Sequence, residues 1–303
     1  MNPLPPPASS LFERFPRRAP VWQLRTRRLD LPRRPLVMGV VNVTPDSFSD
    51  GSRYLETSAA VDHALRLAAE GADILDIGGE STRPYSQGVD AQTELDRVIP
   101  LIAALRPHLL IPISIDTSKA AVAREALAAG AEIINDVTGL EGDPQMLEVA
   151  RQSAAGVCVM HMQGTPLSMQ DNPTYDNVVE DVFHYLRQRR DHLSGHGIEP
   201  ARIALDPGIG FGKTHQHNLT LLAHCFRFHE LGCPVLVGHS RKRFIAKVIG
   251  DNSADRTAGT VGVALALASQ GIQILRVHDV APVRQALLLY EAIGGIDGEA
   301  LVL

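Results

Sequence analysis

One pattern repeats along most of this 303-residue chain: a short apolar run, a polar loop and then an amphipathic stretch. The apolar runs cover residues 36–41, 74–77, 113–115, 133–134, 157–160, 203–205, 235–237 and 274–276. Runs this short are typical of strands buried on both faces of a parallel sheet. The stretches between them read as helices; in the first, Val61, Ala64, Leu65 and Ala68 share one face and Gly71 follows as a helix-ending glycine.

The number of repeats decides the predicted fold class. Eight strands that alternate with helices over ~250 residues predict a (β/α)8 TIM barrel, an α/β fold in a single domain. Helices are expected at residues 58–71, 91–106, 119–129, 144–153 and 178–196, and after each of the last three strands. A doubly wound open sheet is the rival architecture, but no GxGxxG motif follows the first strand.

The barrel is expected to occupy residues 35–303, preceded by a Pro- and Arg-rich extension at residues 1–34. Residues 1–20 lack the apolar core of a signal peptide, and we expect them to be disordered or draped over the surface. Residues 21–31 are expected to form a short hairpin that plugs one end of the barrel.

Composition restricts the kind of partner. A net charge of −5 and a pI near 6.2 argue against nucleic acid, and no apolar run approaches the ~20 residues of a membrane helix. The three cysteines form no CxxC pair, which fits a reducing compartment. We therefore expect a cytoplasmic protein that acts on small molecules and binds neither nucleic acid nor membrane.

Polar side chains end nearly every predicted strand. In a barrel these carboxyl ends meet at one mouth, where active sites lie. The residues concerned are Asn42, Asp76, Asp116, Asn135, Asp136, His161, Asp206, Ser240, Arg276 and His278. Among them, Asp76 precedes Gly78 and Gly79, and we interpret it as a carboxylate that bonds backbone groups rather than substrate.

The sixth strand runs into a glycine-rich stretch at residues 206–214 that ends in Gly212-Lys213-Thr214. A P-loop has the same ending, but it requires a glycine at the position of Pro207, so a P-loop phosphotransferase is disfavoured. Lys213 is interpreted either as a surface residue or as a contact on the substrate side. Four histidines at 161, 215, 217 and 239 lack metal-ligand spacing among themselves and are expected to be solvated loop residues.

Several of these segments carry a close family resemblance. The motifs are Asn42-Val-Thr-Pro-Asp-Ser-Phe-Ser-Asp-Gly51, Gly78-Gly-Glu-Ser-Thr-Arg-Pro84, Asp206-Pro-Gly-Ile-Gly-Phe-Gly-Lys213, Ser240-Arg-Lys242 and Arg276-Val-His-Asp-Val280. They resemble, in order, the motifs of the dihydropteroate synthase family over residues 37–293. Tyr85 departs from that pattern, because a glycine is commonest after Pro84.

The resemblance implies a reaction in folate synthesis. Dihydropteroate synthases condense 6-hydroxymethyl-7,8-dihydropterin pyrophosphate with 4-aminobenzoate and release pyrophosphate. The family mechanism is dissociative: pyrophosphate leaves first, and the aromatic amine captures the resulting cation.

The resemblance also assigns roles to residues at the mouth. The pterin would be bound by Asp116, Asn135, Met160, Asp206, Gly210 and Lys242, and the pyrophosphate by Asn42, Arg276 and His278. Catalysis would rest on Asp116, Asp206, Lys242, Arg276 and His278. Asn42 would also contact a Mg²⁺ cofactor that keeps most of its waters and bridges to the pyrophosphate.

Two long loops would complete the site. The resemblance implies that Phe48, Asp50, Thr82, Arg83, Pro84, Phe211 and Ser240 form the 4-aminobenzoate slot and help the loops to close. A homodimer built through the last helices is likewise implied by the resemblance alone.

Two alternatives share the pterin pocket. A methyltetrahydrofolate-dependent methyltransferase would need neither the Phe48 loop nor the Arg276 and His278 pair. A non-catalytic pterin-binding protein would be expected to have lost these phosphate-binding groups, which this chain keeps.

Overall fold

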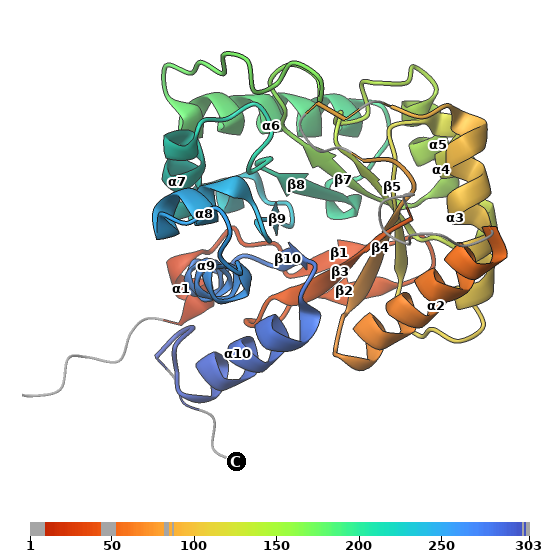
Figure 1. The fold of residues 1–303 in the computed structure, drawn as a ribbon. Helices are drawn as coiled ribbons and strands as arrows, with labels where there is room; N and C mark the ends of the chain where they lie inside the picture. The colour runs from red at the N-terminus through yellow and green to blue at the C-terminus, as the bar shows by residue number, and fades with distance from the viewer. Residues whose placement is uncertain (1–9, 44–52, 82–84, 87, 299, 301–303) are drawn as a thin grey trace, which may run out of the picture.

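The structure of the protein is a computed structural model that describes residues 10–43, 53–81, 85–86, 88–298 and 300. Its centre is a barrel of eight parallel strands, surrounded by helices (Figure 1). The strands are β3 (Leu36–Asn42), β4 (Ile74–Gly78), β5 (Ile113–Asp116), β6 (Ile133–Asp136), β7 (Gly156–Met160), β8 (Ile203–Asp206), β9 (Leu236–Gly238) and β10 (Ile274–Val277). All eight predicted strands are thereby confirmed.

The strand order identifies the architecture. It runs β8-β7-β6-β5-β4-β3-β10-β9, and a parallel bridge between Leu205 and Val235 joins the two ends. A sheet closed in this way is a (β/α)8 barrel, so the predicted fold class is confirmed and the doubly wound open sheet is excluded.

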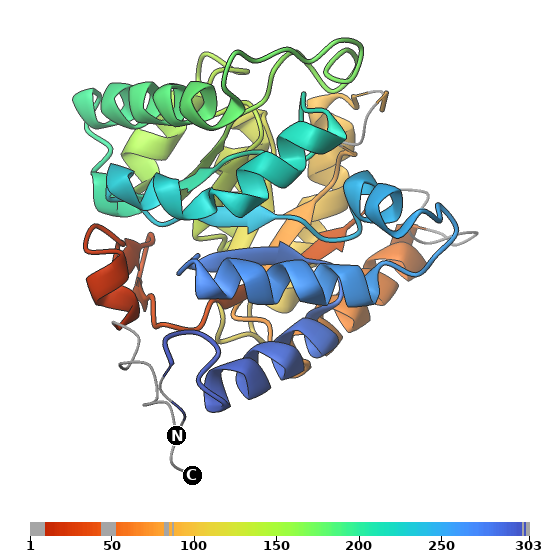
Figure 2. The same cartoon turned by 90° about the vertical axis from the view of Figure 1, so that its left-hand side faces the viewer.

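Helices follow the strands on the outside of the barrel, as Figure 2 shows from a second direction. They are α2 (Arg53–Ala69), α3 (Ala91–Leu105), α4 (Ala120–Ala129), α5 (Met146–Ser153), α6 (Val178–Gly195), α7 (His215–Ala223), α8 (Arg243–Ile249), α9 (Thr257–Ser269) and α10 (Val280–Ala292), with 3-10 turns η2 (Pro200–Arg202) and η3 (Cys225–Leu231). Helix α2 begins before the predicted start at residue 58. Gly71 has a positive φ of 98°, as a helix-ending glycine requires.

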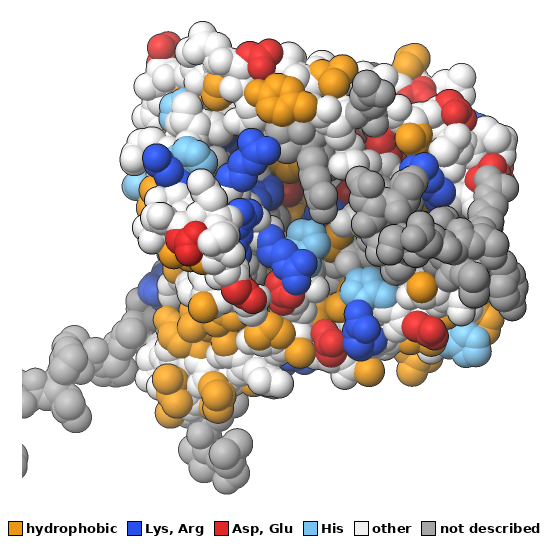
Figure 3. Space-filling model, in the orientation of Figure 1, with side chains coloured by type: hydrophobic (Ala, Val, Ile, Leu, Met, Phe, Trp, Pro, Cys, Tyr) orange, Lys and Arg blue, Asp and Glu red, His pale blue; other side chains and the backbone are white. Residues whose placement is uncertain are grey.

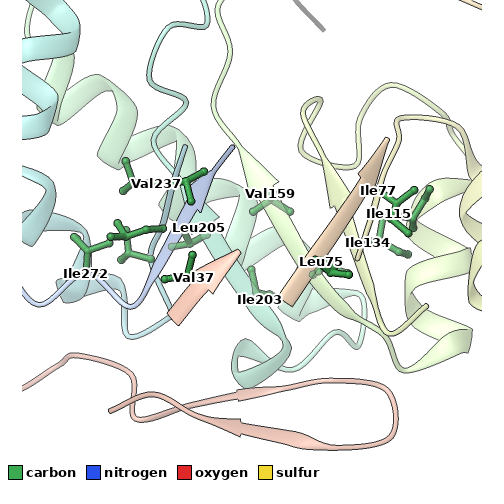
Figure 4. Close-up of a cluster of buried hydrophobic side chains, with 14 of the residues drawn as sticks. Val37, Leu75, Ile77, Ile115, Ile134, Val159, Ile203, Leu205, Val237 and Ile272 are labelled. Atoms are coloured by element: carbon green, nitrogen blue, oxygen red, sulfur yellow. The ribbon is translucent and has the colours of Figure 1, made fainter. Parts of the chain in front are cut away.

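Alternation along the strands divides the core into two parts. Successive side chains of a strand point to opposite faces. Val37 and Leu75 therefore point outward, into the cluster packed against the helices (Figure 4). Their neighbours Met38 and Ile74 belong to a separate apolar cluster that fills the barrel interior.

A hairpin covers the amino-terminal end of the barrel. Its strands β1 (Val21–Gln23) and β2 (Arg28–Asp30) pair antiparallel and lie below the barrel strands in Figure 4. Trp22 and Leu24 are buried in the interior cluster, next to residues such as Ile74 and Cys158. The Trp22 Nε1 donates to the Arg202 carbonyl at 2.9 Å, which satisfies the polar atom of this ring.

The segment before the hairpin is also packed, contrary to the expectation of a draped extension for residues 10–20. Helix α1 (Leu11–Arg14) starts at a Ser10–Glu13 capping box, and Leu11 is fully buried. The buried Arg18 guanidinium donates to the carbonyls of Gly271, Leu31 and Pro32. This short helix therefore contributes to the core of the barrel.

Replacing Trp22 tests the hairpin's contribution to stability. Trp22→Ala should lower the free energy of unfolding by about 3–5 kcal/mol, because it opens a cavity at the closed end and orphans a carbonyl. Urea unfolding followed by circular dichroism measures this. Leu110→Ala, at a site 91% exposed, should change stability by less than about 0.5 kcal/mol; equal losses for the two variants would contradict the assignment.

Candidate active site

The mouth of the barrel is lined by a layer of polar side chains directly above the apolar interior. Because inward positions recur every second residue, Ile74 in the apolar layer is followed by Asp76. The same step leads from Ile133 to Asn135, from Ala204 to Asp206 and from Ile274 to Arg276. Four strands thus change from apolar to polar at one level of the barrel.

Arg276 is at the centre of this layer. Its Nε donates to Asp76 Oδ2 and its Nη2 to Asp116 Oδ2, both at 2.6 Å. Asp76 Oδ2 also accepts from the Asn135 side chain at 3.0 Å. Three strands are therefore connected to β10 through one guanidinium and two carboxylates.

The prediction that Asp76 bonds backbone groups is wrong, because its hydrogen bonds are to the side chains of Asn135 and Arg276. Asp76 is fully buried, and its Oδ1 has no hydrogen-bond partner among the described residues. The Oγ of Ser114, its register partner on β5, is equally unpaired in the described part of the chain. The sequence signal that could have found Asp76 is its inward register with Asn135 and Asp206.

Burial perturbs the carboxylates of this layer. Burial raises the pKa of Asp116, and the nearby Asp76 carboxylate adds to the effect, while Arg276 opposes it. Burial likewise raises the pKa of Asp206, whereas the Lys242 ammonium lowers it. Such groups bind hydrogen-bond donors strongly, since they have little water to compete with.

The loop after β8 folds tightly beside Asp206. The Asp206 Oδ1 accepts from the Gly208 N–H at 2.7 Å. Gly208, Gly210 and Gly212 all have positive φ, and a Cβ at Gly208 would lie 1.9 Å from the His161 carbonyl oxygen. Glycine is required where the backbone turns this tightly, because it has no Cβ and tolerates a positive φ.

Lys242 approaches the same loop from the start of α8. Its Nζ donates to the Ile209 carbonyl and lies 4.7 Å from the centroid of the half-buried Phe211 ring. Burial lowers the pKa of Lys242 to about 8, despite the opposing effect of Asp206. Asp206, Lys242 and Phe211 therefore form one wall of the mouth.

Lys213 is not a surface residue, since it is almost completely buried. Its Nζ bonds to His161 Nδ1 at 2.9 Å, to the Phe211 carbonyl at 2.9 Å and to the His161 carbonyl at 3.3 Å. Burial and the Lys213 charge lower the pKa of His161 to about 3. The expectation of solvated loop histidines is wrong for His161 and also for His239, which is buried and bonded to the Thr260 carbonyl.

The ends of β9 and β10 are joined beside this wall. The Ser240 Oγ accepts from the His278 backbone N–H at 3.2 Å and lies 3.1 Å from His278 Nδ1. Asn42 ends β3 and Met160 ends β7, where Met160 pairs in register with Asp206. The remaining predicted site residues, Phe48, Asp50, Thr82, Arg83 and Pro84, lie outside the described residues.

Glu80 and Tyr85, which are described, lie on either side of residues 82–84 in the sequence. Glu80 forms an ion pair with Lys119, which also contacts the buried Glu94 at 2.6 Å. Tyr85 has a φ of 66°, a conformation that glycine adopts most easily. This conformation agrees with glycine being commonest at this position in the family pattern, and Tyr85 adopts it in spite of its Cβ.

Comparison with known proteins identifies the class. The family model for pterin binding enzymes matches residues 38–278. A dihydropteroate synthase of Neisseria meningitidis serogroup C is 46% identical over 278 residues, which cover 90% of this chain and 98% of that relative. Among solved structures, Xanthomonas albilineans dihydropteroate synthase with 4-aminobenzoic acid has a TM-score of 0.84 at 46% identity, covering 91% of this chain and 98% of that one. The same enzyme in complex with 7,8-dihydropteroate has a TM-score of 0.82 at 45% identity, covering 90% and 98%.

A parallel barrel whose mouth holds a buried polar layer, together with these matches, defines a pterin-binding enzyme. Within that class, the chain belongs to the dihydropteroate synthase family, the transferases of folate biosynthesis.

Two glycines with similar backbones test the tight turn after β8. Gly208 has a φ of 69° and Gly232 a φ of 71°, but only a Cβ at Gly208 meets a backbone oxygen. Gly232→Ala should cost about 1–2 kcal/mol of stability from backbone strain. Gly208→Ala should cost about 3 kcal/mol or more, because the clash adds to the strain. Thermal unfolding measures both, and similar shifts would contradict the proposed close approach.

Proposed function

We propose that this chain condenses 6-hydroxymethyl-7,8-dihydropterin pyrophosphate with 4-aminobenzoate to give 7,8-dihydropteroate and pyrophosphate. The observation that carries the proposal is the polar layer of the mouth, in which three inward carboxylates lie beside Arg276 and Lys242. Acceptors for a donor-rich pterin and cations for a phosphate group thus occur in one recess. Figure 3 shows Lys and Arg side chains gathered around the hollow of this face.

The pterin is proposed to bind between Asp116, Asn135 and Asp206, with Met160 against its face. The N–H groups of its ring edge would donate to the two carboxylates, and Lys242 would donate to its carbonyl oxygen. Gly210 has a φ of 86°, which favours glycine, and a Cβ there would lie 3.0 Å from Lys242 Cδ and push this side chain. Buried acceptors left unpaired by a wrong ligand cost about 1–3 kcal/mol each, which gives selectivity.

Asp116 and Asp206 have a second proposed role. When pyrophosphate departs, positive charge develops on the methylene carbon attached to the pterin. Carboxylates fixed in a water-poor pocket stabilise such charge without reorganising. The same carboxylates would therefore hold the ring and favour bond cleavage.

Pyrophosphate is proposed to leave toward Arg276 and His278, with Asn42 at the end of the neighbouring strand β3. A Mg²⁺ ion would be held by the Asn42 side-chain oxygen. The described residues contain no group of three or more His, Cys, Asp or Glu able to enclose a metal. One protein oxygen plus phosphate oxygens is how Mg²⁺ commonly binds in such sites, so the residues fit this ion. When bound, it would neutralise charge on the departing pyrophosphate.

The aromatic amine is proposed to enter beside Phe211. Phe48, Asp50, Thr82, Arg83 and Pro84 would complete this slot, and Ser240 would lie near its benzoate end. The Lys242 ammonium next to the Phe211 ring supports an arrangement in which pterin and aminobenzoate meet at this wall.

A homodimer through the last helices is also proposed. Leu288 and Leu289 of α10 and Ile293 just after it are exposed, and Figure 3 shows hydrophobic side chains gathered on this part of the surface. Apolar groups collected in this way favour a contact between copies. The cytoplasm is the proposed location: all three cysteines are free and buried, and none of the described helices has the length and apolarity to cross a membrane.

Two related functions are disfavoured by the same residues. A methyltransferase using methyltetrahydrofolate would have no use for the Arg276 and His278 pair. A non-catalytic pterin-binding protein would have no reason to retain it either.

The activity is tested by pyrophosphate release. With dihydropterin pyrophosphate and Mg²⁺, release should depend on added 4-aminobenzoate, and 7,8-dihydropteroate should form in equal amount. Asp116→Asn should lower kcat/KM by about 100-fold, because one charged contact to the reacting ring is lost. Asp191→Asn, an exposed carboxylate on α6, is the matched control; release that ignores 4-aminobenzoate would reject the proposal.

The pH profile tests the role of Lys242. The charged ammonium donates to the pterin much more strongly than the neutral amine does, and burial lowers the pKa of Lys242 to about 8. The kcat/KM for dihydropterin pyrophosphate should therefore fall as the pH rises through about 8. Lys242→Arg should be slower at neutral pH but should lack this alkaline decline, because arginine keeps its proton. Lys247→Arg on the same helix should reproduce the native profile; an unchanged alkaline decline in Lys242→Arg would exclude Lys242 as its source.

A further inference from the structure

The residue between Ser240 and Lys242 has an unusual backbone. Arg241 has a φ of 56°, which makes it one of four non-glycine residues with positive φ among those described. This conformation is unfavourable for a residue with a Cβ, so other contacts must stabilise it. Both of its neighbours belong to the proposed site.

Every polar group of Arg241 is held by a residue from another segment. Its N–H donates to Thr260 Oγ1 at 3.2 Å, and its carbonyl accepts from Arg256 Nη1 at 2.9 Å. Its guanidinium forms a two-pronged ion pair with Asp279, in which Nε donates to Oδ2 at 2.9 Å and Nη2 donates to Oδ1. The left-handed turn is thus fixed by α9 and by the residue after His278.

Asp279 provides an independent observation. It is the N-cap residue of α10, and aspartate is among the best N-cap residues, yet its side chain caps no backbone N–H. Both of its oxygens are directed to Arg241 instead. The Asp279 carboxylate therefore pairs with Arg241 instead of capping α10.

The Arg241–Asp279 ion pair connects two segments that are proposed to bind different parts of the substrate. Residues 240–242 lead to Lys242 on the pterin side, and residues 278–279 carry His278 on the pyrophosphate side. The Ser240–His278 contact and the Arg241–Asp279 pair run between the same two segments, at the ends of the neighbouring strands β9 and β10 (Figure 1). Two adjacent links resist both sliding and rotation of one segment against the other.

We infer that Arg241 and Asp279 are positioning residues that fix the separation between the pterin-binding and the pyrophosphate-binding halves of the site. This inference rests on the proposed function. The Arg241 side chain is 55% exposed, and exposed ion pairs contribute little to stability. The pair therefore acts mainly on geometry.

Dihydropterin pyrophosphate and its two separate parts, the pterin and the pyrophosphate, should respond differently to loss of the Arg241–Asp279 pair. Dihydropterin pyrophosphate must contact both halves at once, so its turnover depends on their separation. A pterin without phosphates, or inorganic pyrophosphate, occupies one half only. The separate ligands should therefore be insensitive to the pair.

The experiment uses Arg241→Gly, which keeps the left-handed backbone and removes the ion pair, and Asp279→Ala, which removes no cap. Each should lower kcat/KM for dihydropterin pyrophosphate about tenfold or more. Binding of 6-hydroxymethylpterin and of inorganic pyrophosphate, measured separately by calorimetry, should change by less than about twofold. The double variant should be no worse than either single variant, because the two residues act as one unit.

Arg284→Lys is the matched control, because Arg284 pairs with Asp73 at the opposite end of the barrel. It should retain native turnover, whereas Arg241→Lys, which cannot form the two-pronged pair, should lose activity. Weaker binding of pyrophosphate alone in Arg241→Gly would show direct contact and overturn the inference. Native turnover of Arg241→Gly or Asp279→Ala would overturn it too. Failure of the proposed function is distinguishable, since the unmodified protein would then release no pyrophosphate in response to 4-aminobenzoate.

Discussion

The mouth of this barrel depends on the ion pairs that Arg276 makes with Asp76 and Asp116. Removing three charges from water is costly, and the cost is met only if each charge has close partners. Arg276 supplies these partners to two carboxylates that would otherwise repel each other, and Asn135 satisfies a further position on Asp76. The Asp76 Oδ1 is buried and has no hydrogen-bond partner among the described residues, so the layer keeps one unused acceptor.

The apolar layer beneath this polar layer limits the access of water to its carboxylates. Met38, Ile74 and Trp22 fill the lower interior, so the carboxylates above them lie in a poorly solvated environment on one side. Burial is accordingly the main cause of the perturbed pKa values of Asp116, Asp206 and Lys242. The hairpin at the closed end thus affects chemistry at the open end, because it excludes water from the barrel interior. The apolar cluster in the barrel interior therefore contributes both to the stability of the fold and to the perturbed pKa values at the mouth.

Much of this could be predicted from the sequence, since it follows from local periodicity. Eight apolar runs gave the strands and the closed barrel, and the residue after each run gave Asp116, Asn135 and Asp206. The predictions that failed concerned residues whose partners come from loops far apart in the sequence. The sequence contains no sign that Lys213 and His161 are bonded within the fold, and inward register alone does not show that Arg276 pairs with Asp76 on the far side of β3. The packing of Leu11 was missed for the same reason, because its partners lie far along the chain.

Residues 212–214 end like a P-loop, but the buried Lys213 is not available to bind phosphate. In a P-loop the lysine is available to phosphate. An ammonium group has three N–H donors, and all three of those on Lys213 have partners: His161 Nδ1, the His161 carbonyl and the Phe211 carbonyl. A phosphate would have to break these bonds and approach past the Asp206 carboxylate, which would repel it. Lys213 therefore serves to join the loops after β7 and β8, and the cations left for phosphate are those on the other side of the mouth.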